Sequence, residues 1–147
     1  MSLRLLLACL WLPLLAAAEP LPLEAAARAS TLQVICYHRF AQACGKDPYC
    51  VGFKDLDAQL AWLQAQGWQS VGLTQVAQAL DGTGALPPKA VMFSVDDGYK
   101  AGAAVAPHFV AHGFHGVFFV TVDSLAMGRL GAKSAFMRPE QLRALEA

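Results

Sequence analysis

The segment AVMFSVDDG, residues 90–98, constrains the fold of this chain more than any other stretch of its sequence. A mostly apolar run leads directly into two adjacent aspartates and a glycine. A continuous run of this kind is typical of a parallel strand whose sheet is covered on both faces. In parallel α/β folds, functional side chains gather at the carboxyl ends of the strands, where the following loops open to solvent. The segment therefore predicts a parallel sheet with Asp96 and Asp97 at its functional edge.

Strand patterns and helical patterns alternate along the rest of the chain. Besides 90–95, short apolar runs predict strands at 32–38, 68–73 and 116–122. Apolar residues at helical spacing predict helices at 55–67, 75–80 and 101–112, and another that begins at Pro139. This alternation predicts an α/β domain rather than an all-β or all-helical one.

Individual residues indicate where the helices begin and end. Gly67 is placed as the C-terminal cap of the helix at 55–67, and Gly113 is placed to stop the helix at 101–112. Thr74 is placed to cap the helix at 75–80, and Pro139 suits a first helical turn.

The first 18 residues have the order of a signal peptide. In MSLRLLLACLWLPLLAAA, one arginine precedes an apolar run that ends in small residues, which predicts cleavage after Ala18. Residues 19–30 then form a linker, and 31–147 form the domain. A membrane anchor is the alternative, but the run is shorter than the roughly 20 residues a span needs, and Pro13 interrupts it. We expect an exported protein of the periplasm, cell envelope or extracellular space, with no stable membrane span after cleavage.

Export would place the remaining cysteines in an oxidising compartment. In CGKDPYC, the turn-forming pair Asp47 and Pro48 favours a disulfide between Cys44 and Cys50. Cys36 is then an odd thiol, which we expect to be buried in the first strand. A zinc site built from these cysteines is the alternative, but no C-x-x-C pair supports it.

The overall charge indicates a neutral ligand. Lys and Arg number 11, Asp and Glu number 11, and the formal net charge is zero. A chain without a polybasic patch has no electrostatic footprint for nucleic acid. We therefore exclude nucleic acid as a partner.

Asp96 and Asp97 are the candidate functional pair. Adjacent carboxylates repel each other, so the pair calls for a nearby cation or a retained proton. Neighbouring residues point in different directions, so one can bind a metal while the other handles a proton. Gly98 permits a tight turn close to a ligand. A helix cap followed by a turn is the alternative, because aspartate is favoured in both.

At this motif the chain resembles the polysaccharide deacetylases of the NodB-homology type, also called carbohydrate esterase family 4. Their first motif, T-F-D-D-G, stands here as SVDDG, with Ser94 and Val95 in place of Thr and Phe. VICYHRF resembles the opening strand of the branch that deacetylates the exopolysaccharide poly-N-acetylglucosamine, and segments 55–80 and 86–120 resemble the elements that follow. The resemblance covers roughly 32–147. It implies the N-terminal portion of a distorted (β/α) barrel, incomplete in this chain.

The resemblance also implies roles for individual residues. By position, Asp96 matches the catalytic base, and Asp97 matches a ligand of a divalent metal, most often zinc, otherwise cobalt or nickel. The backbone N–H of Tyr99 would help to hold the oxyanion. His38, at the end of the first strand, could line the site, and a packing histidine is its alternative. The implied reaction hydrolyses N-acetyl groups from a polysaccharide, so an N-acetylated glycan is the expected substrate.

One part of the family pattern is not in the sequence. The family completes its metal site with two histidines of an H-S/T-x-x-H motif, and the sequence ends at Ala147 before that motif. His108 and His112 have the same spacing, but we expect them across the sheet from Asp97. We therefore expect the N-terminal part of a deacetylase, a fragment or a truncated gene product, inactive by itself. The alternative is a non-catalytic glycan-binding or vestigial module.

Overall fold

The structure of the protein is a computed structural model that describes residues 31–128 and 134–146. The predicted signal peptide at 1–18 and the predicted linker at 19–30 lie outside the described residues. Within the described ranges, no helix is both long enough and apolar enough to cross a membrane.

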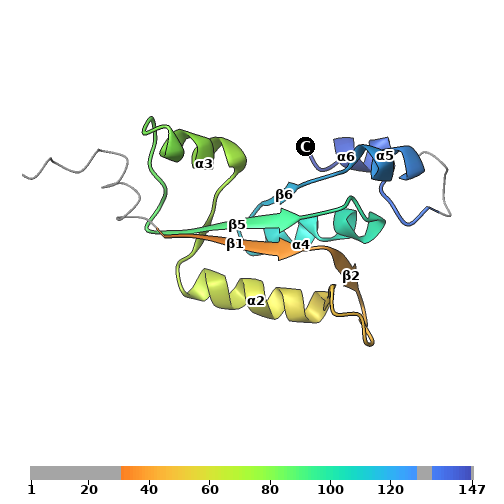
Figure 1. Cartoon of the computed structure of the whole chain (residues 1–147). Helices are drawn as coiled ribbons and strands as arrows, with labels where there is room; N and C mark the ends of the chain where they lie inside the picture. The colour runs from red at the N-terminus through yellow and green to blue at the C-terminus, as the bar shows by residue number, and fades with distance from the viewer. Residues whose placement is uncertain (1–30, 129–133, 147) are drawn as a thin grey trace, which may run out of the picture.

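Strand β5 (Lys89–Val95) is the central strand of a parallel sheet (Figure 1). It pairs along its whole length with β1 (Thr31–Tyr37). Its other edge pairs first with β4 (Gln69–Ser70) and then, nearer the carboxyl end, with β6 (Gly116–Phe118). All of these pairings are parallel, as the sequence predicts.

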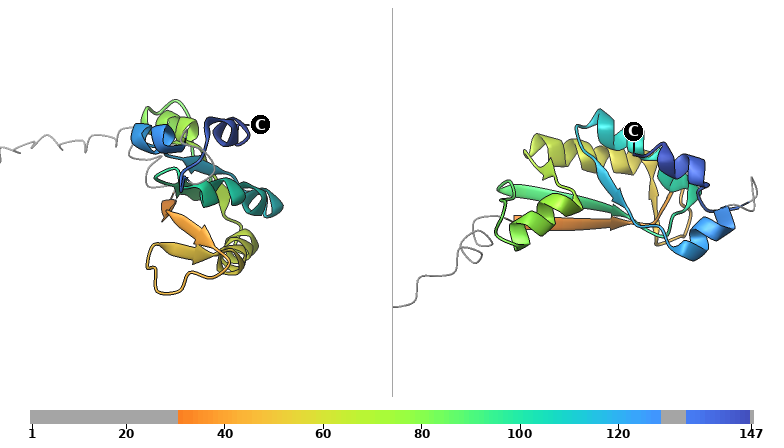
Figure 2. Two further views of the ribbon diagram at one scale, coloured as in Figure 1. Left: turned by 90° about the vertical axis from the view of Figure 1, so that its right-hand side faces the viewer. Right: turned by 90° about the horizontal axis from the view of Figure 1, so that it is seen from above.

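Helices cover both faces of this sheet (Figures 1 and 2). On one face lie α2 (Phe53–Ala65) and α4 (Ala106–Ala111), and on the other lies α3 (Leu73–Leu80). The other described elements are the parallel pair β2 (Arg39–Ala41) and β3 (Cys50–Gly52), the 3-10 turn η1 (Lys100–Ala104), and the helices α5 (Val122–Gly128) and α6 (Pro139–Arg143).

The core follows from the alternation of side chains along β5. Successive residues of a strand point to opposite faces. Val91, Phe93 and Val95 therefore join one cluster with the helices α2 and α4, whereas Ala90 and Met92 join a second cluster beside α3. The predicted helical leucines belong to the first cluster, in which the buried leucines of α2 are Leu56, Leu60 and Leu63.

The predicted helix ends are confirmed at two glycines and wrong at one threonine. Gly67 and Gly113 follow α2 and α4 with φ of +75° and +73°. Thr74, however, lies inside α3, which begins one residue earlier. The cap is instead at Gly72, whose N–H donates to Oε1 of Gln75 at 3.0 Å. Gln75 therefore satisfies the N–H of the cap residue, and no side chain takes the capping role predicted for Thr74.

The helix predicted at 101–112 is divided into η1 and α4. Pro107 explains the division, because proline has no N–H to donate to an earlier carbonyl and its ring crowds the preceding turn. It stands within the first turn of α4, the position where a helix tolerates it.

The strands predicted at 68–73 and 116–122 are shorter than expected. Strand β6 ends because its partner β5 ends, and the last bond of this ladder joins the Phe119 N–H to the Val95 carbonyl at 2.9 Å. Thr121 then starts α5, since its Oγ1 accepts a bond from the Ser124 N–H at 3.1 Å. The sequence pattern predicts Thr121 in the strand, and this prediction is wrong.

Candidate active site

The carboxyl ends of β1 and β5 form the candidate site. In their parallel register, Cys36 lies opposite Ser94, and Tyr37 lies opposite Val95. One more backbone bond, from the Asp96 N–H to the Tyr37 carbonyl at 2.9 Å, extends the pairing beyond the strand. This register brings His38 and Asp96, which are far apart in the sequence, to the same edge of the sheet.

The Asp96 carboxylate is held by two neighbours. Its Oδ1 accepts a hydrogen bond from the Ser94 hydroxyl, and its Oδ2 accepts one from the Cys36 thiol at 3.2 Å. Asp96 itself is half-buried. A carboxylate fixed in this way keeps a defined direction, as a general base must.

Cys36 is exposed, so the prediction of a buried thiol is wrong. Neighbouring side chains of β1 point to opposite faces, and Tyr37 takes the face that packs on the core. Local desolvation nevertheless raises the pKa of the Cys36 thiol, because its sulfur lies against neighbouring groups, and the hydrogen bond to Asp96 raises that pKa further. The thiol is therefore a hydrogen-bond donor at neutral pH.

Cys36, His38 and Asp96 together form a set of side chains able to hold a metal ion. The Cys36 sulfur lies 3.8 Å from Nδ1 of His38, and one ligand atom of each residue lies within 4.8 Å of the others. Asp97 is not a member of this set. Sequence reasoning missed the set because the cysteine and histidine precede the aspartate by about sixty positions and only strand pairing joins them.

Asp97 and Gly98 form a tight turn at the end of β5. Both have left-handed backbones, with φ of +68° and +74°. A Cβ on Gly98 would lie 2.7 Å from Cγ1 of Val120, so only glycine fits there. Neither aspartate caps a helix, since the residue that precedes η1 is Tyr99 and no side chain caps it. A left-handed aspartate is uncommon, and such residues cluster at functional sites.

Tyr99 is fixed by a segment from the C-terminal part of the chain. It forms an antiparallel bridge with Phe136, and the two rings stack with centroids 5.1 Å apart. The bonds of this bridge run from the Lys100 N–H to Ala135 and from the Met137 N–H to Gly98. They leave the N–H of Tyr99 outside the pairing.

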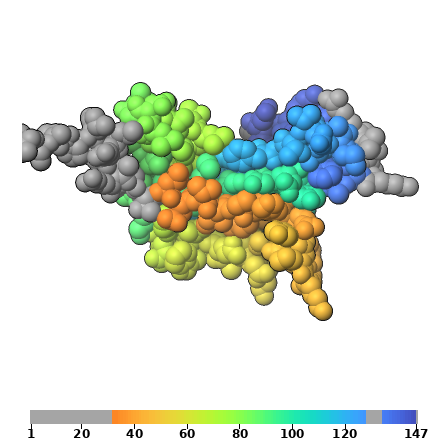
Figure 3. Space-filling view, in the orientation of Figure 1, coloured from red at the N-terminus to blue at the C-terminus, as the bar shows by residue number. Residues whose placement is uncertain are grey.

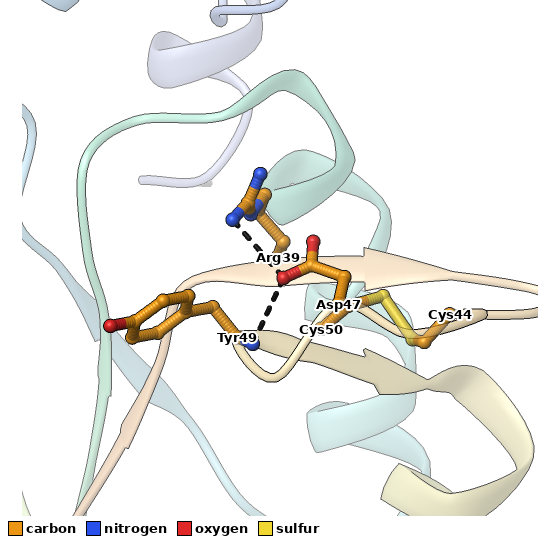
Figure 4. The surroundings of a disulfide bond; sticks show 5 residues. All are labelled: Arg39, Cys44, Asp47, Tyr49 and Cys50. Atoms are coloured by element: carbon orange, nitrogen blue, oxygen red, sulfur yellow. Dashed lines mark hydrogen bonds and ion pairs between the residues drawn. A yellow bond between two sulfur atoms is a disulfide. The ribbon is translucent and has the colours of Figure 1, made fainter.

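A disulfide loop stands beside this edge (Figures 3 and 4). Cys44 and Cys50 are bonded, with their sulfur atoms 2.08 Å apart. Inside the loop, Oδ1 of Asp47 accepts bonds from the Arg39 guanidinium at 3.1 Å and from the Tyr49 N–H at 3.0 Å. Figure 3 shows the loop as an orange projection from the body of the molecule.

Two residues near this loop were not singled out from the sequence. The Arg39 guanidinium lies 5.9 Å from the ring centroid of Tyr49 and 5.6 Å from that of Tyr99. The Tyr49 ring also lies 5.9 Å from the ring of His38 and is exposed. The available signal in the sequence was the position of Tyr49 directly after the turn-forming pair Asp47 and Pro48, which favours an exposed aromatic ring.

The other three histidines of the chain lie elsewhere. Nδ1 of His108 lies 2.7 Å from Oδ1 of Asp57 on α2, and Nε2 of His112 lies 3.6 Å from the same oxygen. His115 hydrogen-bonds Ser70 through Nδ1 at 2.9 Å. The structure therefore does not bring His108 or His112 together with Asp97.

Comparison with known proteins identifies the fold. No protein-family model matches the chain. A stretch of 46 residues, 31% of the chain, is 44% identical to the poly-beta-1,6-N-acetyl-D-glucosamine N-deacetylase of Escherichia coli K12 and covers 7% of that protein. The structure is similar to a de-N-acetylase from Aggregatibacter actinomycetemcomitans, with a TM-score of 0.68 and 24% identity over 78% of this chain and 50% of that one. It is also similar to IcaB from Ammonifex degensii, with a TM-score of 0.64 and 25% identity over 80% of this chain and 48% of that one.

The parallel fold is that of the N-terminal half of solved polysaccharide deacetylases, and the DDG turn stands at the carboxyl end of its central strand. The chain is similar to these proteins, as the resemblance implies, and its architecture is consistent with the N-terminal part of their barrel. It spans about half the length of the solved deacetylases that it matches.

Proposed function

We propose that this chain is the N-terminal part of a metal-dependent hydrolase that removes N-acetyl groups from an exopolysaccharide of N-acetylglucosamine. The observation that carries the proposal is the left-handed Asp97 and Gly98 turn at the end of β5, beside the end of β1, in a fold shared with deacetylases. The substrate printed for the E. coli relative favours an exopolysaccharide over peptidoglycan or a chitin-like glycan.

Asp96 is the proposed catalytic base. In amide hydrolysis, a water molecule attacks the carbonyl carbon while a base accepts its proton. The Ser94 hydroxyl holds one oxygen of the Asp96 carboxylate, which sets the direction of the other. That other oxygen accepts a hydrogen bond from the Cys36 thiol and has a second lone pair that can receive the proton of the attacking water.

Asp97 is the proposed metal ligand, and Tyr99 the proposed oxyanion donor. The Asp97 carboxylate, half-buried at the strand end, fits a divalent cation as one ligand, with further ligands supplied by the longer protein. Zinc, cobalt or nickel bound there would polarise the amide carbonyl. The N–H of Tyr99, which its bridge with Phe136 does not use, would donate to the oxygen that becomes negative. The products are acetate and a free amine on the sugar.

His38 and the disulfide loop are proposed to form the glycan-binding surface of the site. His38 is half-buried, and its ring lies beside the exposed ring of Tyr49. Sugar rings stack on exposed aromatic faces, so this pair suits a neutral N-acetylated glycan. The disulfide also supports export to the periplasm, cell envelope or extracellular space, because disulfides persist in oxidising compartments.

The chain by itself is proposed to lack deacetylase activity. Its sequence holds four histidines, of which His108, His112 and His115 are occupied away from Asp97. A zinc site that supports hydrolysis normally takes three protein ligands and a water molecule. Asp97 needs ligands from beyond these residues.

Acetate release from poly-β-1,6-N-acetylglucosamine tests this proposal. The whole protein that contains this sequence should release acetate, lose activity to a chelator and recover it with zinc, cobalt or nickel. Asp96→Asn should lower kcat about 10²- to 10⁴-fold, the usual share of a general base. Asp81→Asn, an exposed aspartate after α3, is the matched control and should leave kcat unchanged.

Two results would contradict the proposal. One is full activity in the Asp96→Asn variant. The other is a whole protein that binds the glycan but releases no acetate with any of the three metals, which would favour the non-catalytic glycan-binding module.

A further inference from the structure

We propose that Cys36, His38 and Asp96 form a zinc-binding set of their own, contained in this chain and separate from Asp97. The three residues come from the carboxyl ends of two paired strands. They are not the ligands implied by the family motif, which needs Asp97 and a later pair of histidines. Metal binding here requires no deacetylase activity.

The strand register places the three side chains on one face. Cys36 lies opposite Ser94 in the ladder. His38 and Asp96 each follow two positions later, and residues two apart in extended chain point the same way. Two neighbouring strands thus present four polar side chains in one patch, and three of the four carry metal-ligating atoms.

The distances between the three ligand atoms suit tetrahedral coordination of a zinc ion. Zinc bonds of about 2.0 to 2.3 Å at tetrahedral angles place neighbouring ligand atoms about 3.3 to 3.6 Å apart. The Cys36 sulfur lies 3.2 Å from Oδ2 of Asp96 and 3.8 Å from Nδ1 of His38. All three atoms already lie within 4.8 Å of one another. Small rotamer adjustments therefore complete the three-ligand face.

The ligand chemistry favours zinc over magnesium or calcium. A thiolate and an imidazole select borderline and soft ions, whereas magnesium and calcium prefer oxygen alone. Three protein ligands leave one position open, as in catalytic zinc sites. The Cys36 thiol releases its proton to solvent when the sulfur binds the ion.

Two further observations support the set. The Ser94 hydroxyl binds the other carboxylate oxygen of Asp96, and such outer hydrogen bonds orient metal ligands. Cys36 is also the free thiol of the described part of the chain, and it is exposed. An ion can reach it from solvent without any change in the fold.

The set has a consequence that rests on the proposed function. Asp96 is a weaker base while its carboxylate binds an ion, because the positive charge favours the ionised form. Zinc at Cys36, His38 and Asp96 should therefore inhibit deacetylation, and it should do so at a site distinct from the activating metal.

Titration of the 147-residue chain with cobalt(II), followed by competition with zinc, tests the site without any activity assay. Cobalt bound through a thiolate gives a charge-transfer absorption in the near ultraviolet, which oxygen and nitrogen ligands do not give. We expect this band at one equivalent of cobalt, and zinc should remove it. The Cys44 to Cys50 disulfide is kept oxidised during the titration, so that its sulfurs do not bind the ion.

Matched variants locate the ion. Cys36→Ser should abolish the band and weaken cobalt binding by at least about 100-fold, more than the loss of an outer partner costs. His38→Gln should weaken binding similarly. Asp97→Asn should keep the thiolate band. Asp81→Asn, at an exposed position, and Cys9→Ser should leave both the band and the affinity unchanged, and circular dichroism should show all variants folded.

The opposite pattern overturns the inference. No thiolate band in the folded wild-type chain would exclude the set, as would a band that survives Cys36→Ser. Cobalt binding that is lost in Asp97→Asn and kept in Cys36→Ser would place the ion on the family's aspartate instead. None of these outcomes depends on acetate release, so failure of this inference is distinguishable from failure of the proposed function.

Discussion

His108 contacts Asp57 through a bond of 2.7 Å between Nδ1 and Oδ1, which joins α4 to α2. The ring of Phe53 stacks on the same histidine with centroids 5.1 Å apart. The bond to His108 lowers the pKa of the Asp57 carboxyl, and the nearby His112 adds to this effect. The two histidines with the metal-binding spacing are therefore part of helix packing.

This contact makes the stability depend on pH. The lowered pKa of Asp57 means that its ionised form is favoured in the folded state. The contribution is present above the ordinary carboxyl pKa of about 3.9 and is lost as the pH falls through the lower folded value. Asp57→Asn should therefore be less stable than the wild type near neutral pH, and the difference should shrink in acid.

Urea unfolding between about pH 6 and pH 2.5 measures this dependence. Asp81→Asn, at an exposed position, is the control and should follow the wild type throughout. If Asp57→Asn lowered the free energy of unfolding by the same amount across this pH range, the pH dependence could not come from the Asp57 carboxylate.

The turn after Asp97 tolerates only glycine. Gly98→Ala would place a Cβ 2.7 Å from Cγ1 of Val120 on a backbone with φ of +74°. The left-handed backbone and the overpacking together should cost about 2 to 4 kcal/mol of unfolding free energy. Gly113→Ala is the matched control, because its φ is +73° but nothing lies within 4 Å of the added atom. It should cost only about 1 kcal/mol, and equal losses in the two variants would show that Val120 does not confine the turn.

The disulfide should stabilise the folded chain modestly, because it restricts the unfolded state. Cys44 and Cys50 are six positions apart, and closing so short a loop is worth about 2 kcal/mol in the chain-entropy model. Replacing both cysteines by Ala should lower the unfolding free energy by about this amount. A reductant should destabilise the wild type equally and leave the double variant unaffected. Sensitivity of the double variant to reductant would point to another disulfide.

The Ser94 hydroxyl should position the carboxylate of Asp96, the proposed base. Its bond to the Asp96 carboxylate is of the charged kind, worth about 1.5 to 3 kcal/mol, so Ser94→Ala in the whole protein should lower kcat about 10- to 100-fold. Ser94→Thr keeps the hydroxyl and should retain activity. Ser70→Ala, whose hydroxyl contacts His115 outside the site, is the control. Equal kcat values for Ser94→Ala and the wild type would remove Ser94 from the mechanism.

Much of the fold could be predicted from local pattern. The apolar run before Asp96 predicts the central strand, because strands buried on both faces are typically near-continuous apolar runs. The leucines of α2 and the terminal glycines of α2 and α4 likewise act through contacts within a few positions. The wrong predictions concern strand ends whose position depends on a partner strand that is distant in the sequence. Strand β6 stops at Phe118 because β5 ends, and nothing in the sequence of β6 records that limit.

The site divides in the same way. The sequence by itself determined the Asp96, Asp97 and Gly98 turn, since consecutive residues carry it and its left-handed backbone depends on local sterics. Only the tertiary structure decided what surrounds it. Parallel pairing of β1 with β5 places Cys36 beside Asp96, 60 positions later in the sequence. The packing of α4 on α2 places His108 in contact with Asp57. Such contacts depend on the register of strand pairing and on which faces of the helices are buried. Both depend on the whole fold, so neither can be read from a local sequence pattern.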